Sequence, residues 1–445
     1  MSKIALIGSG GVIFAMNFIK DILISEELRN CEISLMDIDP ERLNNSVIVT
    51  KMTAEKLGVT PNYSATTDLH EAVKGADYVI TLFRAGTLEH QRIEQDIPRK
   101  YGVDQVVGDS AGPGGVFRGL RTLKALFEVV DAMELECPGA LLLNYVNPMS
   151  LNTIALNRRA KTVKVIGLCH SIPGTASALA GYIGVDKQDV SYWVAGINHQ
   201  AFFLKFQVNG KDAIPRIADA MNDPAVYNKD RIRFELFRHF GYFPTESSGH
   251  GSEYLPYIRK RQDLIDKFCC LPENAEKDYD MGVGTSGASL KVCEELQQKN
   301  EAKIKALVDG SEEIDLKPSA EYAVQIIKAI ETNTMLSANL NVMNRGLIPT
   351  LPPECCVEVP CMVDGAGINP CRIDDYPEQL AGLNRGLINM HIMGADGALE
   401  GDRRKVFQAI ALDPLTAAVC SLDEILAMTN ELFEALKSEL DPRFY

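Results

Sequence analysis

The chain has 445 residues, 46% of them hydrophobic and 24% charged, and its formal net charge is −15. This length suits two domains, and the composition is that of an ordinary soluble globular protein. The negative charge argues against nucleic acid and anionic membranes as partners, because both require a basic protein face, and it favours small-molecule ligands.

The N-terminal stretch "MSKIALIGSGGVIF" places one lysine before an apolar run, as a short signal peptide does. Glycines interrupt this run and no small-residue cleavage site follows, so we expect a strand and a loop here. No apolar stretch approaches the roughly 20 residues of a membrane helix. The eleven cysteines are irregularly spaced, which favours reduced thiols over disulfides. We therefore expect a cytoplasmic protein.

Short apolar runs alternate with amphipathic stretches through the first half of the chain. The candidate strands are "KIALIG", "EISLMD", "DYVITL", "ALLLNYV" and "VKVIGLC". Strands that are apolar throughout and separated by helices predict a parallel sheet covered on both faces. We therefore expect residues 1–192 to form a Rossmann-like, doubly wound α/β domain of the lactate and malate dehydrogenase type.

After residue 192 the pattern changes. "WVAGINHQAFFLKFQVNG" predicts an antiparallel hairpin, and longer helical stretches follow, such as "SAEYAVQIIKAIETN" and "SLDEILAMTNELFEALKSEL". Residues 193–445 are expected to form an α+β domain that packs over the strand ends of the first. The cysteines of "CCVEVPCMV" lack a CxxC pair, and because this segment alternates like a buried strand we favour core thiols over a zinc site.

The stretch "IALIGSGGVIF" predicts a dinucleotide-binding turn. Gly8, Gly10 and Gly11 stand between strand and helix, where backbone N–H groups can face a pyrophosphate at a helix N-terminus. The third glycine of the usual fingerprint is replaced by Ile13. The second strand ends in Asp37, whose carboxylate suits the adenosine ribose hydroxyls and disfavours a 2′-phosphate. Turn, strand and acid together predict NAD as cofactor.

Polar residues follow three of the predicted parallel strands. Arg84, Asn147 and the pair Cys169 and His170 each come just after a strand, where ligands bind in open α/β sheets. The hairpin supplies Asn198 and His199. A thiolate and an imidazole at one point suit a divalent transition metal. Taken singly, Cys169 also fits core packing, and His199 fits a hydrogen-bonded strand histidine.

The order of motifs resembles glycoside hydrolase family 4, the NAD- and metal-dependent glycosidases, and most closely its melibiase-type α-galactosidase branch. The resemblance runs nearly end to end, through "LMDIDPERL", "GPGGVFRGLRTL", "LLNYVNPMSLNT", "GLCHSIPGT", "AGINHQAFFL", "GYFPTESSGHGSEYLPY", "CCVEVPCMVD" and "LDPLTAAV".

The resemblance implies a route that differs from the two-carboxylate mechanism of most glycosidases. NAD takes a hydride from C3 of the sugar, a base removes the acidified C2 proton, and the metal stabilises the enediolate as a Lewis acid. The C1 oxygen is then expelled, water adds, and the hydride returns. NAD is therefore not consumed.

By position, the resemblance implies that Cys169 and His199 ligate Mn²⁺ and that Tyr254 is the base, with Tyr257 as its nearest rival. A tyrosine in such a segment is more often a core residue. A free tyrosine titrates near 10, so the base needs help from its surroundings. Asp109, before the GPGG loop, matches an acidic residue that tunes the tyrosine, although it also fits a helix N-cap.

Further roles follow from neighbouring positions. His170 stands where the phosphoglycosidase branch has its general acid, and an imidazolium can protonate a leaving alcohol near neutral pH. Asn147 matches a substrate contact, although it also suits a turn. Asn198, beside His199, and Arg84 are further candidate substrate contacts. Relatives in this family assemble as dimers or tetramers, which implies a homodimer or homotetramer.

The expected substrate is an α-galactoside such as melibiose. Gln91 lies where the phosphoglycosidase branch has an arginine, which argues against a 6-phospho-α-glycoside. An α-glucuronide or α-galacturonide remains open because Arg84 could bind a carboxylate. Two other classes remain: an NAD-dependent hydroxy-acid dehydrogenase, which consumes NAD and needs no metal, and a redox sensor that binds NAD without using Tyr254.

Overall fold

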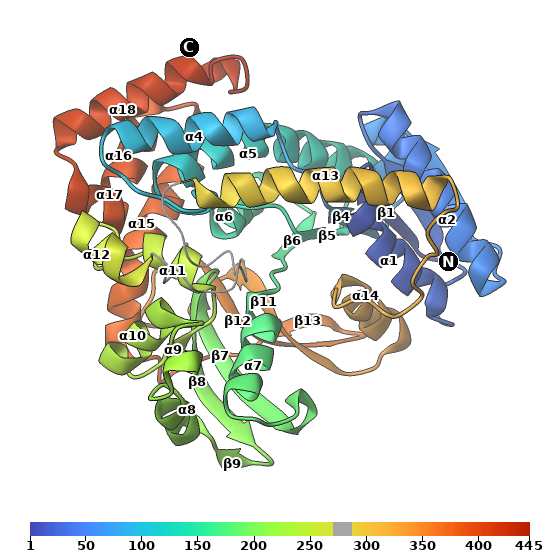
Figure 1. Cartoon of the computed structure of the whole chain (residues 1–445). Coiled ribbons are helices and arrows are strands. Elements are labelled where there is room, and N and C mark those ends of the chain that lie inside the picture. Colours follow the sequence, from blue (N-terminus) through green and yellow to red (C-terminus); the bar gives the residue numbers. More distant parts are fainter. Residues whose placement is uncertain (270–286) are drawn as a thin grey trace.

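One mixed sheet runs through the molecule (Figure 1). The computed structural model describes residues 1–269 and 287–445. The strands are β1 (Lys3–Ile7), β2 (Glu32–Met36), β3 (Asn62–Thr66), β4 (Tyr78–Thr81), β5 (Leu141–Asn144), β6 (Lys164–Gly167), β7 (Val190–Ile197), β8 (Gln200–Val208), β9 (Lys211–Asp212), β10 (Phe243–Pro244), β11 (Leu336–Met343), β12 (Cys356–Asp364) and β13 (Gly367–Pro370).

Strands β1 to β6 are parallel and lie in the order β6-β5-β4-β1-β2-β3. This is the order of a dinucleotide-binding sheet, which confirms the Rossmann-like prediction. The central strands β1, β4 and β5 are almost wholly buried, as a parallel sheet covered on both faces requires. Strand β3 was not predicted from the sequence, because it is an exposed edge strand with no apolar run.

Antiparallel strands of the second half extend the same sheet. The order continues from β6 to β11, β12, β7, β8 and β10. The expected hairpin is formed by β7 and β8, and β12 carries the clustered cysteines as a buried strand. The junction is narrow, because β11 pairs with β6 only at Asn341 and Gly167. The carboxyl ends of the parallel strands therefore open beside the hairpin.

Helices of the first half alternate with the parallel strands. They are α1 (Val12–Ile24), α2 (Pro40–Leu57), α3 (Leu69–Val73), α4 (Leu88–Lys100), α5 (Gly112–Glu136), α6 (Met149–Arg159), α7 (Ser171–Tyr182) and the 3₁₀ helix η1 (Lys187–Asp189). Helix α1 packs on α2, and α5 packs on α3 and α6.

Helices of the second half surround the hairpin and return to the first half. They are α8 (Ile214–Ala220), α9 (Pro224–Tyr227), α10 (Arg231–Phe240), α11 (Ser248–Glu253), α12 (Gln262–Phe268), α13 (Ala288–Val308), α14 (Ala323–Thr332), α15 (Glu378–Glu400), α16 (Arg403–Ala411), α17 (Pro414–Val419), α18 (Leu422–Ala435) and η2 (Pro442–Phe444).

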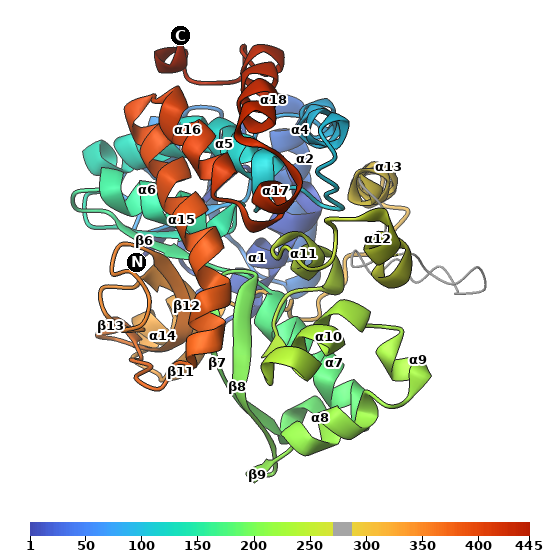
Figure 2. The same ribbon diagram turned by 90° about the vertical axis from the view of Figure 1, so that its left-hand side faces the viewer.

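The two halves share one core. Helix α15 packs along α5 and α6, α18 packs on α4, and α13 crosses from α4 to α2 (Figures 1 and 2). The largest cluster of buried apolar side chains includes strands of the parallel sheet, β11, β12 and the last helices. A smaller cluster lies between the hairpin and helices α7, α8 and α10. This packing fixes the hairpin against the ends of the parallel strands.

Candidate functional site

A cavity of about 570 Å³ opens between the parallel strand ends and the hairpin. Such a position suits a ligand site in an open α/β sheet. Its walls include most of the polar residues singled out from the sequence: Arg84, Asp109, Asn147, Cys169, His170 and His199. Tyr254 and Asn198 lie directly behind it, lining a second cavity of about 10 Å³.

Cys169, His199 and Glu246 converge in this cavity. One ligand atom from each residue lies within 4.8 Å of the other two. Cys169 follows β6, His199 is in the two-residue turn between β7 and β8, and Glu246 precedes α11. His199 has a φ of 62°, a left-handed conformation that costs energy for a residue other than glycine and is often retained at functional positions. Thiolate, imidazole and carboxylate together can hold a divalent transition metal.

Tyr254 lies behind His199. Its hydroxyl is 2.9 Å from Nδ1 of His199, and the two rings are nearly parallel. Only 2% of Tyr254 is exposed. Tyr257, the rival candidate, is 47% exposed and its ring packs near Phe240 instead. Of the two tyrosines, Tyr254 is the one that contacts His199.

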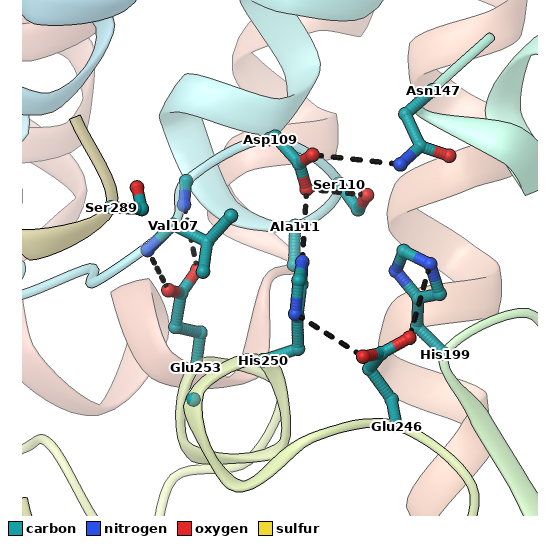
Figure 3. Close-up of polar contacts among 12 residues, drawn as sticks. Val107, Asp109, Ser110, Ala111, Asn147, His199, Glu246, His250, Glu253 and Ser289 are labelled. Atoms are coloured by element: carbon teal, nitrogen blue, oxygen red, sulfur yellow. Dashed lines mark hydrogen bonds and ion pairs between the residues drawn. The ribbon is translucent and has the colours of Figure 1, made fainter. Parts of the chain in front are cut away.

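His250 links two carboxylates beside this cluster (Figure 3). Its Nε2 lies 3.4 Å from Oδ1 of Asp109, and its Nδ1 lies 3.4 Å from Oε1 of Glu246. The other oxygen of Glu246 is 3.4 Å from Nε2 of His199. Asp109 also accepts hydrogen bonds from Ser110, at 2.8 Å, and more weakly from Asn147, at 3.5 Å. The result is a chain of alternating acids and imidazoles.

The charges in this row of acids and imidazoles lower the pKa values of its two acids, Asp109 and Glu246. Burial alone raises the pKa of Asp109, but the His250 hydrogen bond and the Arg118 charge outweigh it, so the pKa lies well below its ordinary value. Burial also opposes ionisation of Glu246, and His199 and His250 reverse this, so its pKa is lowered. The pKa of His250 is raised, because Glu246 and Asp109 overcome the effect of its own burial. The site thus favours two carboxylates bridged by an imidazolium.

The pKa values of the thiol and the phenol of the site are shifted in the opposite direction, upward. Burial, with the charge of Glu246, raises the pKa of Cys169. Burial, with the charges of Asp109 and Glu246, holds the pKa of Tyr254 well above its ordinary value. Surrounding carboxylates therefore keep both groups protonated in the protein alone. A divalent cation in the cluster reverses this electrostatic environment.

Glu253 fixes the loop that carries Asp109. It is buried and accepts hydrogen bonds from the backbone N–H groups of Val107 and Gly108, the second at 3.0 Å (Figure 3). Glu253 directly precedes Tyr254 in the chain. The same short segment therefore carries the tyrosine and fixes the position of the Asp109 loop relative to it.

Residues ahead of α14 fix the segment of Cys169 and His170. The Tyr322 hydroxyl accepts a hydrogen bond from the Cys169 N–H at 2.9 Å and donates one to the Cys169 carbonyl at 2.8 Å. Nε2 of His170 lies 2.5 Å from Glu321, and its ring stacks on Tyr145. His170 is therefore turned toward Glu321, with half of its side chain exposed.

The predicted substrate contacts lie at different depths. Arg84 is accessible to solvent but enclosed by the walls of the large cavity, near Arg118. Asn147 precedes a cis proline and reaches Asp109. Asn198 is only 5% exposed, and its Nδ2 has no hydrogen-bond partner among the described residues. Of the three, Arg84 and Asn147 line the large cavity itself.

The glycine turn lies at the carboxyl end of β1. A Cβ at Gly8 would lie 2.8 Å from the backbone nitrogen of Phe83, and one at Gly10 would lie 2.5 Å from Cγ of Asp37. Asp37 accepts hydrogen bonds from the N–H groups of Gly10, at 2.8 Å, and Asp39, at 3.0 Å. Gly11 is the N-cap of α1 and contributes no side-chain cap. The turn is closed to side chains, and the first N–H groups of α1 have no side-chain acceptor there.

Glu246, His250, Glu253, Arg118 and Tyr322 were not predicted as site residues from the sequence. A signal for two of them was present, because Glu246 and His250 precede Tyr254 by eight and four residues, a spacing that places side chains on one helical face. The cysteines of β12 are buried and belong to no converging group of potential metal ligands in residues 1–269 and 287–445.

Comparison with known proteins agrees with this architecture. An α-galactosidase of Bacillus subtilis (strain 168) is 36% identical over 98% of this chain and 98% of its own length. An α-galactosidase of Rhizobium meliloti (strain 1021) is 33% identical over 97% of this chain and 88% of its own length. A 6-phospho-α-glucosidase from gut microorganisms, solved with NAD and Mn²⁺, superposes with a TM-score of 0.82 at 20% identity, covering 99% of both chains.

Within the described part of the chain, none of the helices combines the length and apolarity needed to span a membrane.

Residues 3–185 match the model for the family 4 glycosyl hydrolases, and residues 194–416 match the model for the C-terminal domain of the same family. The two matched segments together cover most of the chain, and the relatives extend over nearly all of it. The chain therefore belongs to glycoside hydrolase family 4.

Proposed function

We propose that the protein hydrolyses α-galactosides of the melibiose type and that it uses NAD and Mn²⁺. The convergence of Cys169, His199 and Tyr254 beside the strand ends of a dinucleotide-binding sheet carries this proposal. The two relatives that are α-galactosidases support the choice of sugar. We further propose a homodimer or homotetramer in the cytoplasm, with the chain divided near residue 192 into the two domains expected from its sequence.

The residues present fit a divalent cation. Cys169 and His199 offer a thiolate and an imidazole, and Nε2 is the imidazole nitrogen directed at Glu246. Nδ1 of His199 faces the Tyr254 hydroxyl. With Nε2 committed to a cation, the ring carries its proton on Nδ1 and donates it toward the tyrosine oxygen, as histidine ligands commonly do toward neighbouring acceptors. Cation binding and the base are thereby linked through one ring.

The glycine turn fits NAD. Gly8 and Gly10 let the turn pack closely against Phe83 and Asp37, and a Cβ at Gly11 would have the Gly8 carbonyl oxygen, at 3.5 Å, as its nearest described neighbour, so the start of α1 can accept a pyrophosphate. Asp37 already accepts the Gly10 N–H, so it holds the turn in shape, and we propose that its remaining lone pairs accept the ribose hydroxyls. A carboxylate at this position disfavours a 2′-phosphate, which supports NAD over NADP.

When bound, NAD takes up and returns a hydride at C3 of the sugar, and the cation acts as a Lewis acid on the adjacent oxygens. The chain supplies the proton transfers and the positioning. Tyr254 removes the C2 proton, while Asp109 orders the tyrosine through Ser110 and His250. Asn147 and Asn198 orient the sugar hydroxyls. The C1 oxygen then leaves, and water adds to the double bond that remains.

His170 is proposed as the group that protonates the leaving oxygen. Glu321 binds its Nε2, which leaves Nδ1 as the nitrogen able to face the substrate. Half of the side chain is exposed in the cavity, so an aglycone can reach it. An elimination needs less acid assistance than a direct displacement, and the effect of removing His170 should depend on the leaving group.

A second candidate substrate, an α-galacturonide or α-glucuronide, is favoured by a specific observation. Arg84 and Arg118 both line the cavity. Burial and the Arg118 charge lower the pKa of Arg84, and Arg84 has no hydrogen bond or ion pair among the residues that the structure describes. Two neighbouring guanidinium groups suit a carboxylate. A 6-phospho-α-glycoside ranks third, because the buried Gln91 stands where an arginine was expected for that branch.

The test is to incubate reduced protein with Mn²⁺, catalytic NAD and melibiose in D₂O and to follow the products by NMR. Galactose deuterated at C2 is the expected result. Galactose without deuterium would overturn the elimination route. Cleavage of galacturonides or glucuronides in place of melibiose would select the second candidate. Reduced NAD accumulating in proportion to substrate would instead indicate a dehydrogenase.

A further inference from the structure

Glu246 is directed at the same point as the two expected metal ligands. The three residues come from separate parts of the fold, after β6, between β7 and β8, and before α11. Their ligand atoms nevertheless lie within 4.8 Å of one another. We propose that Glu246 is a third protein ligand of the divalent cation in this chain. This inference rests on the metal-dependent function proposed above.

The distances suit shared coordination. Oε2 of Glu246 lies 3.4 Å from Nε2 of His199. Two ligand atoms that bind one cation at about 2.0 to 2.2 Å lie about 2.8 to 3.1 Å apart at neighbouring octahedral positions and about 3.3 to 3.6 Å apart in tetrahedral geometry. Because Nδ1 of His199 is occupied by Tyr254, the nitrogen beside Glu246 is also the one available to a metal.

The hydrogen bonds of Glu246 leave one oxygen for this purpose. Oε1 accepts from the Ser247 N–H at 2.8 Å and faces His250 at 3.4 Å. Oε2 faces Nε2 of His199. The backbone bond and His250 therefore hold the carboxylate with Oε2 pointing to the cluster, as neighbouring groups commonly orient metal-binding carboxylates.

The other carboxylate of the site, Asp109, is engaged elsewhere. It can form a group of converging atoms with His199 and His250, but that group lacks the thiol. One oxygen of Asp109 faces Ser110 and His250, and the other faces Asn147 and Arg118. A cation there would have to compete with the Arg118 guanidinium, which lies 3.7 Å away. Glu246 is the better placed carboxylate.

A second anionic ligand also changes the charge balance. A thiolate and a carboxylate facing one point repel each other, and a divalent cation between them turns this repulsion into attraction. Thiolate and carboxylate together neutralise a charge of two, and with the imidazole they provide three protein ligands. Such a site holds its cation before the substrate arrives and keeps other positions open for sugar oxygens.

The test measures cation binding to the purified full-length protein without substrate. Co²⁺ is titrated into reduced, metal-free protein, because its d–d absorption reports coordination and its thiolate charge-transfer band reports Cys169. Mn²⁺ affinity is measured in parallel by calorimetry. Glu246→Gln is compared with Glu235→Gln, whose carboxylate pairs with Arg238 on α10 and lines neither cavity. Glu246→Asp keeps the charge on a shorter side chain.

Glu246→Gln is expected to weaken Mn²⁺ and Co²⁺ binding about 10- to 100-fold and to change the d–d spectrum, while the thiolate band persists at saturation and shows that the variant is folded. Glu235→Gln should bind both cations as the wild type does. Wild-type affinity and an unchanged d–d spectrum in Glu246→Gln would overturn the assignment alone. No cation binding by the wild-type protein would overturn it together with the metal-dependent function.

Discussion

The hydroxyl of Tyr254 lies 2.9 Å from Nδ1 of His199, and Nε2 of the same ring lies 3.4 Å from Glu246. One imidazole therefore contacts the proposed base on one side and the proposed metal ligands on the other. Because Tyr254 is almost fully buried among carboxylates, its phenolate is disfavoured in the protein alone. In the proposed mechanism, the tyrosine therefore needs this contact to act as a base.

Replacing Tyr254 by phenylalanine should remove the base without removing the metal ligands. We expect hydrolysis and exchange of the C2 proton with D₂O to fall together by about 100- to 10,000-fold even at saturating Mn²⁺, while Mn²⁺ affinity falls only about 10-fold, because Nδ1 of His199 loses its partner. Tyr257→Phe is the matched control, because that ring is exposed beside Phe240, and it should exchange normally. Normal exchange in Tyr254→Phe would show that another group removes the proton.

The Tyr322 hydroxyl bonds to both the N–H and the carbonyl of Cys169. Tyr322→Phe leaves these two backbone groups without their partner, and the thiol loses its fixed direction. We expect Mn²⁺ affinity to fall about 10- to 100-fold, as for other groups that orient metal ligands. Calorimetry on substrate-free protein measures this. Tyr78→Phe removes a hydroxyl that is bonded to Glu331 at the amino end of β4, away from the strand ends of the site, and should bind Mn²⁺ normally. A loss in both variants would indicate a general effect of stability.

The parallel half of the fold could be predicted because its strands are continuous apolar runs with clear boundaries. The exposed strand β3 lacks that signal, so only its neighbour β2 identifies it. At the site, Cys169 and His199 could be predicted because each follows a strand or fills a tight turn. Their approach to one another depends on the narrow pairing of β6 with β11, which no local pattern encodes.

The supporting residues were harder to predict, for a different reason. Tyr322 lies 153 residues from Cys169, and Glu253 reaches a loop 145 residues earlier. Buried glutamates and tyrosines of this kind resemble ordinary surface or core residues until their partners are known. The four-residue spacing of Glu246, His250 and Tyr254 was the only local indication that one segment brings three polar side chains to the same face.

Glu253 should matter to stability as well as to the position of Asp109. Its buried carboxylate accepts two backbone N–H groups of the 107–108 segment. Glutamine keeps one acceptor and places an amide donor against the other N–H, so we expect Glu253→Gln to lower the free energy of unfolding by about 1 to 3 kcal/mol. Urea unfolding followed by circular dichroism measures this. Glu128→Gln, on the exposed side of α5, should change the free energy of unfolding little. Equal stability of the two variants would show that the hydrogen bonds of Glu253 to the 107–108 segment do not stabilise the protein.

His391 should make stability depend on pH. It lies on α15 behind Tyr254, and burial lowers its pKa to about 4 from an ordinary value of 6.5. Below pH 6.5 the unfolded chain binds a proton at this site while the folded protein does not. The free energy of unfolding therefore decreases as the pH falls toward 4. The shift corresponds to roughly 3 kcal/mol over this window.

Without the buried imidazole, the free energy of unfolding should depend less on pH over the same range. Unfolding free energies of the wild type and His391→Gln, measured in urea at pH 7.5, 5.5 and 4.5, are subtracted so that groups common to both proteins cancel. The advantage of the wild type over His391→Gln should shrink as the pH falls. His70→Gln serves as the control, because that side chain is 56% exposed beside Glu136, and its difference from the wild type should show no comparable decline. A constant difference between the wild type and His391→Gln would mean that His391 titrates alike in the folded and unfolded states.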